Sequence, residues 1–301
     1  MKKILLKLFN KKLYQEYKES SKKKERNNTY LNKVLPKLDE ILSAINSKEE
    51  ISFLHSGHLG DVIYSLPLIK EISKNKKCNL FIEVGKKIPQ NVPNQNHPFG
   101  DYFLTKNASE KLLPLLKNQN FISDVKIYNG ERIDINLNLF REMPINFNID
   151  AVRWYFHLTG IHANLNEPYV SANKHQNFNN NIVIMRSLRR QNDLVDYSFL
   201  NDYKNILFLG LNDEYISLKK NLSNLEHYES KNFLELAEII NSSKVFIGNL
   251  SFGFALAEGL KVPRLLESGP DFPLVYPTGA NAFDFYFQKH FESLFLKLYK
   301  N

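Results

Sequence analysis

The sequence predicts an α/β protein of two tandem domains, each built on a parallel sheet. At 301 residues the chain is long enough for roughly two domains. Its composition, 43% hydrophobic and 24% charged, is typical of a globular protein with a full core. Short apolar runs alternate with helical patterns and glycine turns, as in βαβ units. The single cysteine, Cys78, excludes an internal disulfide and a cysteine-based zinc cluster.

The basic charge of the chain is concentrated in its first 26 residues. These hold ten Lys and Arg against three Glu, whereas the other 275 residues carry a net charge of only +1. Apolar residues recur between the lysines at helical spacing, which suits a helix on an anionic membrane surface: Leu5, Leu6, Phe9, Leu13 and Tyr17. A solvated, frayed tail is the alternative.

The charge distribution and hydropathy also limit the partners and the location. The nearly neutral body argues against a nucleic-acid-binding face. No apolar run approaches the ~18 residues needed to cross a bilayer. No signal-peptide cleavage site follows the N-terminal apolar residues. We therefore expect a cytoplasmic protein, peripheral on the inner face of the membrane.

The first domain is expected over residues 49–165, after a basic tail and helix over 1–48. The helix at 31–47 has an irregular first turn at Pro36. A Pro-, Asn- and Gln-rich stretch at 86–105 predicts an acceptor-type loop. The remaining elements are strands at 51–56, 78–84, 124–128 and 133–139, and helices at 61–74, 108–118 and 150–159.

The second domain is expected over residues 180–282, after a polar, Asn-rich linker at 162–181. A final aromatic-rich helix is expected over residues 283–301. The elements between them are strands at 182–187, 206–210, 244–248 and 263–267, and helices at 213–222, 232–242 and 252–261. Ligands of such folds bind outside the carboxyl ends of the parallel strands, so residues just after strands are the first candidates for chemistry.

The segment HSGHLGD (55–61) follows the first strand. Gly57 and Gly60 permit a tight turn and close approach of a ligand. Asp61 stands at the helix start, where it either caps the helix or acts as a general base, and His58 is the second candidate base. His55 and His58 alone are a weak metal signal, and we expect no metal.

The second domain repeats this construction after the strand at 245–248. Gly248, Asn249 and Ser251 lead into a helix that contains Gly253. The free amides and positive end of such a helix form a phosphate or diphosphate site, although a simply capped helix gives the same pattern.

Three of the eight arginines lie within five positions, at Arg186, Arg189 and Arg190. Lysine is the usual cation of this chain, so arginine here suggests bidentate recognition of phosphate or carboxylate. Surface solubility is the alternative. Glu226, before the helix at 232, is a weaker candidate for contact with a donor ribose.

Two segments resemble glycosyltransferase family 9, the ADP-heptose:lipopolysaccharide heptosyltransferases. HSGHLGDVIYSLPLIKEI is similar to their opening motif, and NFLELAEIINSSKVFIGNLSFGFALAEGLKVPRLLE is similar to their donor motif. The motifs occur in the family's order, about 190 residues apart. The resemblance implies a GT-B fold: two Rossmann-like domains facing a cleft, with the nucleotide sugar on the second and the acceptor on the first. It also implies a terminal helix that packs back across.

By position, Asp61 matches the family's proposed catalytic base, and Asn249, Ser251 and Gly253 match the turn that holds the donor diphosphate. The motif's aspartate is Leu250 here, and its helix histidine is replaced, with Phe254 and Ala255 in that region. Glu258 instead supplies a carboxylate on that helix. Gly57, Gly60 and His97 are the candidates of the acceptor-side loop. No D-x-D triplet occurs.

These observations predict an inverting, metal-independent glycosyltransferase without a cofactor. Its co-substrate is a nucleotide-diphosphate sugar, and its acceptor is a saccharide or glycolipid. Asp61 would deprotonate the acceptor, while the three arginines and the amides at 251–253 neutralise the leaving diphosphate. The alternatives are a GT-B nucleotide-sugar epimerase and an inactive GT-B module that binds a nucleotide or glycan.

Overall fold

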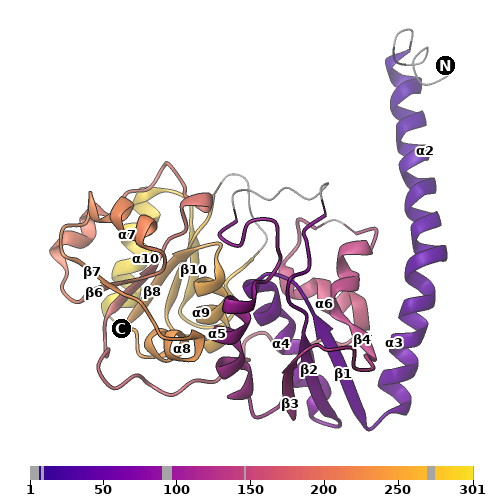
Figure 1. Ribbon diagram of the computed structural model, residues 1–301. Helices are drawn as coiled ribbons and strands as arrows, with labels where there is room; N and C mark the ends of the chain where they lie inside the picture. The colour runs from indigo at the N-terminus through magenta and orange to yellow at the C-terminus, as the bar shows by residue number, and fades with distance from the viewer. Residues whose placement is uncertain (1–6, 8–9, 90–96, 146, 270–274, 301) are drawn as a thin grey trace.

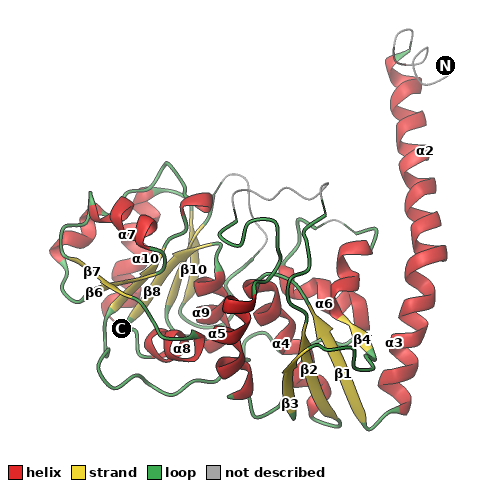
Figure 2. Ribbon diagram, in the orientation of Figure 1, coloured by secondary structure: helices red, strands yellow, loops and turns green. Residues whose placement is uncertain are grey.

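The computed structural model describes residues 7, 10–89, 97–145, 147–269 and 275–300. Two parallel sheets, each with helices packed on it, lie side by side in the body of the molecule (Figure 1, Figure 2). This arrangement confirms the predicted α/β class with two parallel-sheet domains.

The first sheet has four strands in the order β3-β2-β1-β4, all parallel. Its strands are apolar where they meet the helices, and Ile51, Phe53 and Leu80 are fully buried. The strands are β1 Glu50–His55, β2 Lys77–Ile82, β3 Asp124–Ile127 and β4 Ile135–Asn136; the helices are α4 Leu59–Ser73, α5 Lys106–Lys117 and α6 Ala151–Thr159.

The second sheet has six parallel strands in the order β10-β9-β8-β5-β6-β7. The strands are β5 Ile182–Met185, β6 Ile206–Leu209, β7 Leu225–Tyr228, β8 Val245–Asn249, β9 Arg264–Glu267 and β10 Ala282–Phe285. The helices are α7 Asn212–Lys219, α8 Phe233–Asn241, α9 Phe252–Leu260 and α10 Gln288–Lys300.

Both sheets reverse their strand order beside their first strand. β1 lies between β2 and β4, and β5 lies between β6 and β8. Loops that leave the carboxyl ends of two such neighbouring strands diverge to opposite faces, which opens a ligand site between them. The candidate turns after β1 and β8 stand at these two points.

The two domains share a continuous hydrophobic core. Its cluster contains Tyr64 and Leu112 from the first domain together with Leu236 and Ala255 from the second. Helix α4 packs against α9, and α5 packs against α8. The close approach involves Gly60, since a Cβ atom there would lie 3.9 Å from the Ala255 Cβ.

A long helix precedes the first sheet and extends away from the body (Figure 1). It runs as α2 Lys11–Thr29, a π turn at Tyr30–Val34 and α3 Leu35–Ser47, so the irregularity precedes Pro36. Helix α2 has no buried residue, and Leu13 and Tyr17 are exposed. Leu5, Leu6 and Phe9 lie outside the described residues. None of the described helices is long and apolar enough to cross a membrane.

Two expected elements differ in the structure, and one strand is additional. The strand at 133–139 is only Ile135–Asn136, because a 3₁₀ helix begins at Leu137. The sequence does not predict the edge strand β7, which contains Glu226. The final helix starts at Gln288 instead of 283, because Ala282–Phe285 forms β10.

Helix α10 packs on the second domain and does not turn back toward the first. Its buried residues Phe291, Phe295 and Leu298 belong to a core cluster that spans residues 182–298. Its main contacts are with β8, β9 and β10. This packing corrects the expectation of a crossing helix.

Candidate functional site

The turn after β1 is built against residues that follow β4. The Ser56 N–H donates to the Asn138 Oδ1 at 3.0 Å, and the Gly57 N–H donates to the His55 Nδ1 at 2.9 Å. A Cβ at position 57 would lie 2.3 Å from the Arg141 Nη2. A side chain at position 57 would therefore displace Arg141 from its place beside the turn.

Asp61 lies in the first turn of α4, and its carboxylate pairs with Arg141. The Arg141 Nη2 donates to the Asp61 Oδ2 at 2.8 Å, and both side chains are about one-fifth exposed. The Arg141 Nη1 donates to the Asn138 Oδ1 at 2.9 Å. The guanidinium also lies over the Phe140 and Phe103 rings, 4.3 and 4.5 Å from their centroids. The carboxylate is thus held in place while part of it stays accessible.

His58 and His97 stack beside Asp61, with ring centroids 4.2 Å apart. Burial lowers the pKa of His58, and the charges of Arg141 and Arg189 lower it further, against the opposing effect of Asp61. Burial, with His58, Arg189 and Arg190, lowers the pKa of His97 to about 3. Both imidazoles are therefore neutral at physiological pH. Because Arg189 and Arg190 belong to the second domain, these effects place the two histidines of the first domain within electrostatic range of the arginine segment.

His55 and His58 are only a weak metal signal in the sequence. Within the part of the chain that the structure describes, no group of three or more His, Cys, Asp and Glu side chains could hold a metal ion. His55 is instead fully buried behind the turn, with its Nε2 2.8 Å from the Tyr155 Oη.

Asn249 ends β8 and fixes the arginine segment. The Ser187 N–H donates to the Asn249 Oδ1 at 2.9 Å, and the Asn249 Nδ2 donates to the Ser187 carbonyl at 2.7 Å. Its side chain is fully buried. Asn249 therefore holds residues 186–190 beside the start of α9, and its amide is occupied within the protein.

The N-terminus of α9 is the candidate diphosphate site. Ser251 is the N-cap residue, yet its side chain makes no capping hydrogen bond and its buried Oγ has no partner. Amide groups at such an end carry partial positive charge and suit an anion. Gly253 has a packing role, since a Cβ there would lie 2.2 Å from the Met185 Sδ.

The three arginines separate into two environments. Arg186 forms a bidentate pair with Glu267, with Nε–Oε2 at 2.7 Å and Nη2–Oε1 at 2.9 Å, and Glu267 is 1% exposed. The Tyr197 hydroxyl also donates to Glu267, at 2.7 Å. The structure thus assigns Arg186 to a buried carboxylate instead of the donor. The half-buried Arg189 has a buried Nε without a hydrogen-bond partner, and it is better placed for an anion.

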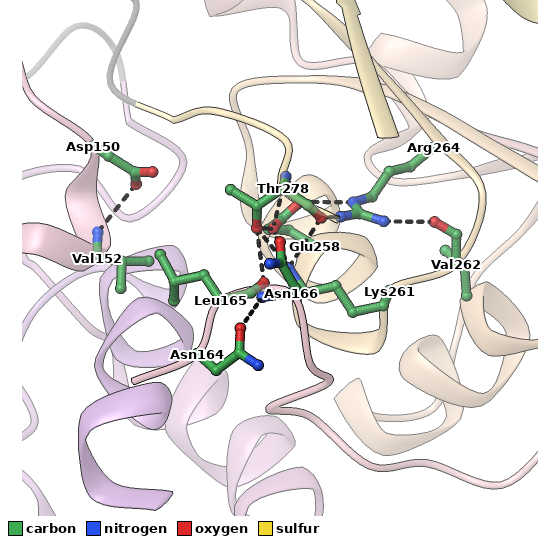
Figure 3. Close-up of polar contacts among 10 residues, drawn as sticks. All are labelled: Asp150, Val152, Asn164, Leu165, Asn166, Glu258, Lys261, Val262, Arg264 and Thr278. Carbon is green, nitrogen blue, oxygen red and sulfur yellow. Dashed lines mark hydrogen bonds and ion pairs between the residues drawn. The ribbon is translucent and has the colours of Figure 1, made fainter. Parts of the chain in front are cut away.

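Glu258 is engaged inside the protein (Figure 3). It is 3% exposed, and its carboxylate accepts from the Arg264 Nε at 2.6 Å and the Thr278 Oγ1 at 2.7 Å, and pairs with Lys261. Glu226 is exposed in the edge strand β7. The structure therefore gives Glu258 a structural role rather than donor contact, and does not bring Glu226 together with the turns after β1 and β8.

Arg141, Asn138 and Tyr155 are the site residues that sequence reasoning missed. Each contacts the turn after β1 from more than 75 positions away along the chain. The scarcity of arginine offered a signal for Arg141, because it follows a predicted strand as Arg189 does.

Comparisons with known proteins define the fold of the chain. No family model matches the sequence, and a search of curated proteins gave no match. A glycosyltransferase family 9 structure from Veillonella parvula superposes with a TM-score of 0.53 at 14% identity, covering 84% of this chain and 89% of that one. E. coli heptosyltransferase WaaC with ADP-2-deoxy-2-fluoro heptose gives 0.50 at 12% identity, covering 82% and 99%. The chain therefore has the GT-B fold of these structures, as its two motifs imply.

Proposed function

We propose that this chain is a glycosyltransferase that moves a sugar from a nucleotide-diphosphate donor to a hydroxyl of a saccharide or glycolipid. One observation carries the proposal: Asp61, a partly exposed carboxylate at the first switch point, shares its turn with His58, whose pKa is lowered by the charge of Arg189 at the second switch point. The GT-B fold supports this assignment, because its similar structures include a heptosyltransferase with a nucleotide-sugar analogue.

The residues divide the chemistry between the two domains. Asp61 takes the proton of the acceptor hydroxyl, whose oxygen attacks the anomeric carbon from the face opposite the diphosphate. Charge at that carbon is oxocarbenium-like, as in glycoside hydrolysis, and a single displacement inverts its configuration. Arg189, Arg190 and the amides at the start of α9 stabilise the departing diphosphate, so we propose that no metal is needed.

His58 and His97 complete the acceptor side of the proposed site. Their neutral rings stack next to Asp61 and add no positive charge that would compete for the carboxylate. His58 is the second candidate base, because it lies on the same turn within electrostatic range of Asp61.

The N-terminal helix supports a proposed location at the membrane. Residues 1–26 carry a net charge of +7. Helix α2 buries no side chain, so its lysines are available to an anionic lipid surface. Each basic residue near such a surface contributes about 1 kcal/mol. This contact would bring the site to a lipid-linked acceptor on the cytoplasmic side.

A nucleotide screen tests the proposed function. We expect one of ADP, GDP, UDP and CDP to raise the melting temperature of the full-length protein, because a ligand of the native state stabilises it. The matching nucleotide sugar should then release its nucleoside diphosphate. Stabilisation without release of the diphosphate would indicate an inactive binding module. Conversion to an isomeric nucleotide sugar would indicate an epimerase. No stabilisation by any of the diphosphates would contradict the proposal.

A further inference from the structure

Three hydrogen bonds form a closed chain behind the turn that carries Asp61. They run from the Gly57 N–H to His55, from His55 to Tyr155, and from Tyr155 back to the Asp61 carbonyl. We propose that His55 and Tyr155 are positioning residues that lock this turn and thereby fix the Asp61 carboxylate. The role of these two residues in sugar transfer rests on the proposed function. The three hydrogen bonds themselves, called the lock below, are a property of the fold.

The tautomer of His55 follows from its two partners. The Gly57 amide can only donate, so the His55 Nδ1, 2.9 Å away, accepts and carries no proton. In a neutral imidazole the proton then lies on Nε2, which is 2.8 Å from the Tyr155 Oη. Burial, assisted by the charge of Arg141, lowers the pKa of His55 well below its usual value, so the ring stays neutral.

The direction of the last bond is equally determined. The Tyr155 Oη accepts from His55, so its own proton is available for the Asp61 carbonyl at 2.8 Å. Burial raises the pKa of Tyr155, which keeps the hydroxyl protonated. Every donor in the chain has one acceptor, and the sequence of bonds has a single consistent direction. Buried networks that are fully satisfied in this way specify one geometry.

The lock acts on the backbone of the turn, whereas Arg141 acts on the carboxylate of Asp61. Tyr155 lies on α6, which packs against α4, and its ring contacts Phe140 edge to face at 5.3 Å. Arg141 holds the Asp61 carboxylate, while Tyr155 holds the Asp61 backbone. Neither His55 nor Tyr155 is exposed, so both act through Asp61 and not on a substrate.

The first arm of the test measures the tautomer. Long-range 1H–15N NMR spectra of histidine-labelled, full-length protein distinguish the two neutral forms, and His55→Gln identifies the signal of His55. We expect the Nε2–H tautomer at both pH 6 and pH 8. A proton on Nδ1, or a charged ring at pH 6, would overturn the lock whether or not the protein is an enzyme.

The second arm measures its consequence for Asp61. Donor hydrolysis is followed with whichever of ADP-heptose, GDP-mannose and UDP-glucose is turned over. Because small displacements of a reacting group cost large factors in rate, Tyr155→Phe should lower kcat at least about tenfold. The donor KM should stay within about twofold. Tyr169→Phe, which removes another buried hydroxyl that has no partner, should leave kcat unchanged.

The variants must also be combined. If Tyr155 acts through Asp61, Tyr155→Phe should have little further effect in an Asp61→Asn background. A parental kcat in Tyr155→Phe, or the same loss in both backgrounds, would overturn the positioning role. If the parent turns over no nucleotide sugar, the proposed function fails, and the tautomer alone decides the lock.

Discussion

Arg186 and Arg189 stand three positions apart on one segment, yet their surroundings give them different roles. Arg186 is 12% exposed and neutralises the fully buried Glu267 side chain. Arg189 has no hydrogen-bond partner at its Nε, and its charge affects His58 and His97 across the domain interface. The same residue type therefore supports the fold at one position and is proposed to bind an anion at the other.

The two arginines should respond differently to truncation. Arg189→Ala should weaken binding of the stabilising nucleoside diphosphate by about 1.5–3 kcal/mol, because a charge-assisted bond is lost. Arg186→Ala should instead lower the free energy of unfolding by about 3–5 kcal/mol, since it leaves Glu267 buried without its partner. Calorimetric titration and urea unfolding measure the two effects.

The phosphate-free nucleoside is the control for this pair, and it should bind to Arg189→Ala as it does to the parent. An Arg186→Ala variant with parental stability and lost diphosphate binding would reverse the two assignments.

At the scale of elements, helix α6 is capped by a carboxyl group, and burial disfavours the charged form of that group. Asp150 caps α6 by accepting from the Val152 N–H at 3.3 Å (Figure 3). Burial raises its pKa to about 6, the nearby Glu258 adds to the rise, and the Val152 bond partly opposes it. The native state therefore holds this proton at pH values where the unfolded chain has lost it.

This shift gives a pH-dependent stability with a definite sign. The contribution is fully present below the unfolded pKa of about 3.9 and is lost as the pH rises through about 6. Asp150→Asn keeps the cap but removes the ionisation, so it should raise the free energy of unfolding by about 1–3 kcal/mol at pH 7.5. The gain should be much smaller at pH 4. Urea unfolding at both pH values measures it, and an equal gain at each would contradict the assigned cause.

Elements also differ in how far the sequence predicts them. Central strands such as β6, Ile206–Leu209, are continuous apolar runs because both faces of a parallel sheet are covered. Strands β7 and β10 lie at the edges of the sheet and contain Glu226 and Asp284, so no such run marks them. Strand β4 is two residues long, too short for any periodic pattern.

Over the whole molecule, the order of elements and the two turns could be predicted, but the contacts between distant segments could not. The HSGHLGD turn and the start of α9 both lie where their glycine patterns indicate. The pairing of Asp61 with Arg141 depends on β4 lying beside β1, which no local pattern records. The pairing of Arg186 with Glu267 likewise depends on β5 and β9 flanking β8.

Removal of the N-terminal helix should leave the stability of the body almost unchanged. Because α2 buries no side chain, a 27–301 variant should unfold within about 0.5 kcal/mol of the full chain. The full chain should co-sediment with anionic vesicles at low salt, and less so at high salt. The shortened chain should stay in solution. Equal sedimentation of the two proteins, or none at low salt, would contradict the proposed membrane contact.

The central claim is that Asp61 is the catalytic base of a transferase whose active site lies between the switch points of the two sheets. Asn keeps the shape of Asp but cannot accept the proton, so Asp61→Asn is the most direct measurement. We expect turnover to fall at least about a hundredfold while donor affinity is kept. The free energy of unfolding should drop by no more than about 1–2 kcal/mol, the loss of one partly exposed ion pair. A folded variant with near-parental turnover would contradict the account and make His58 the next base to test.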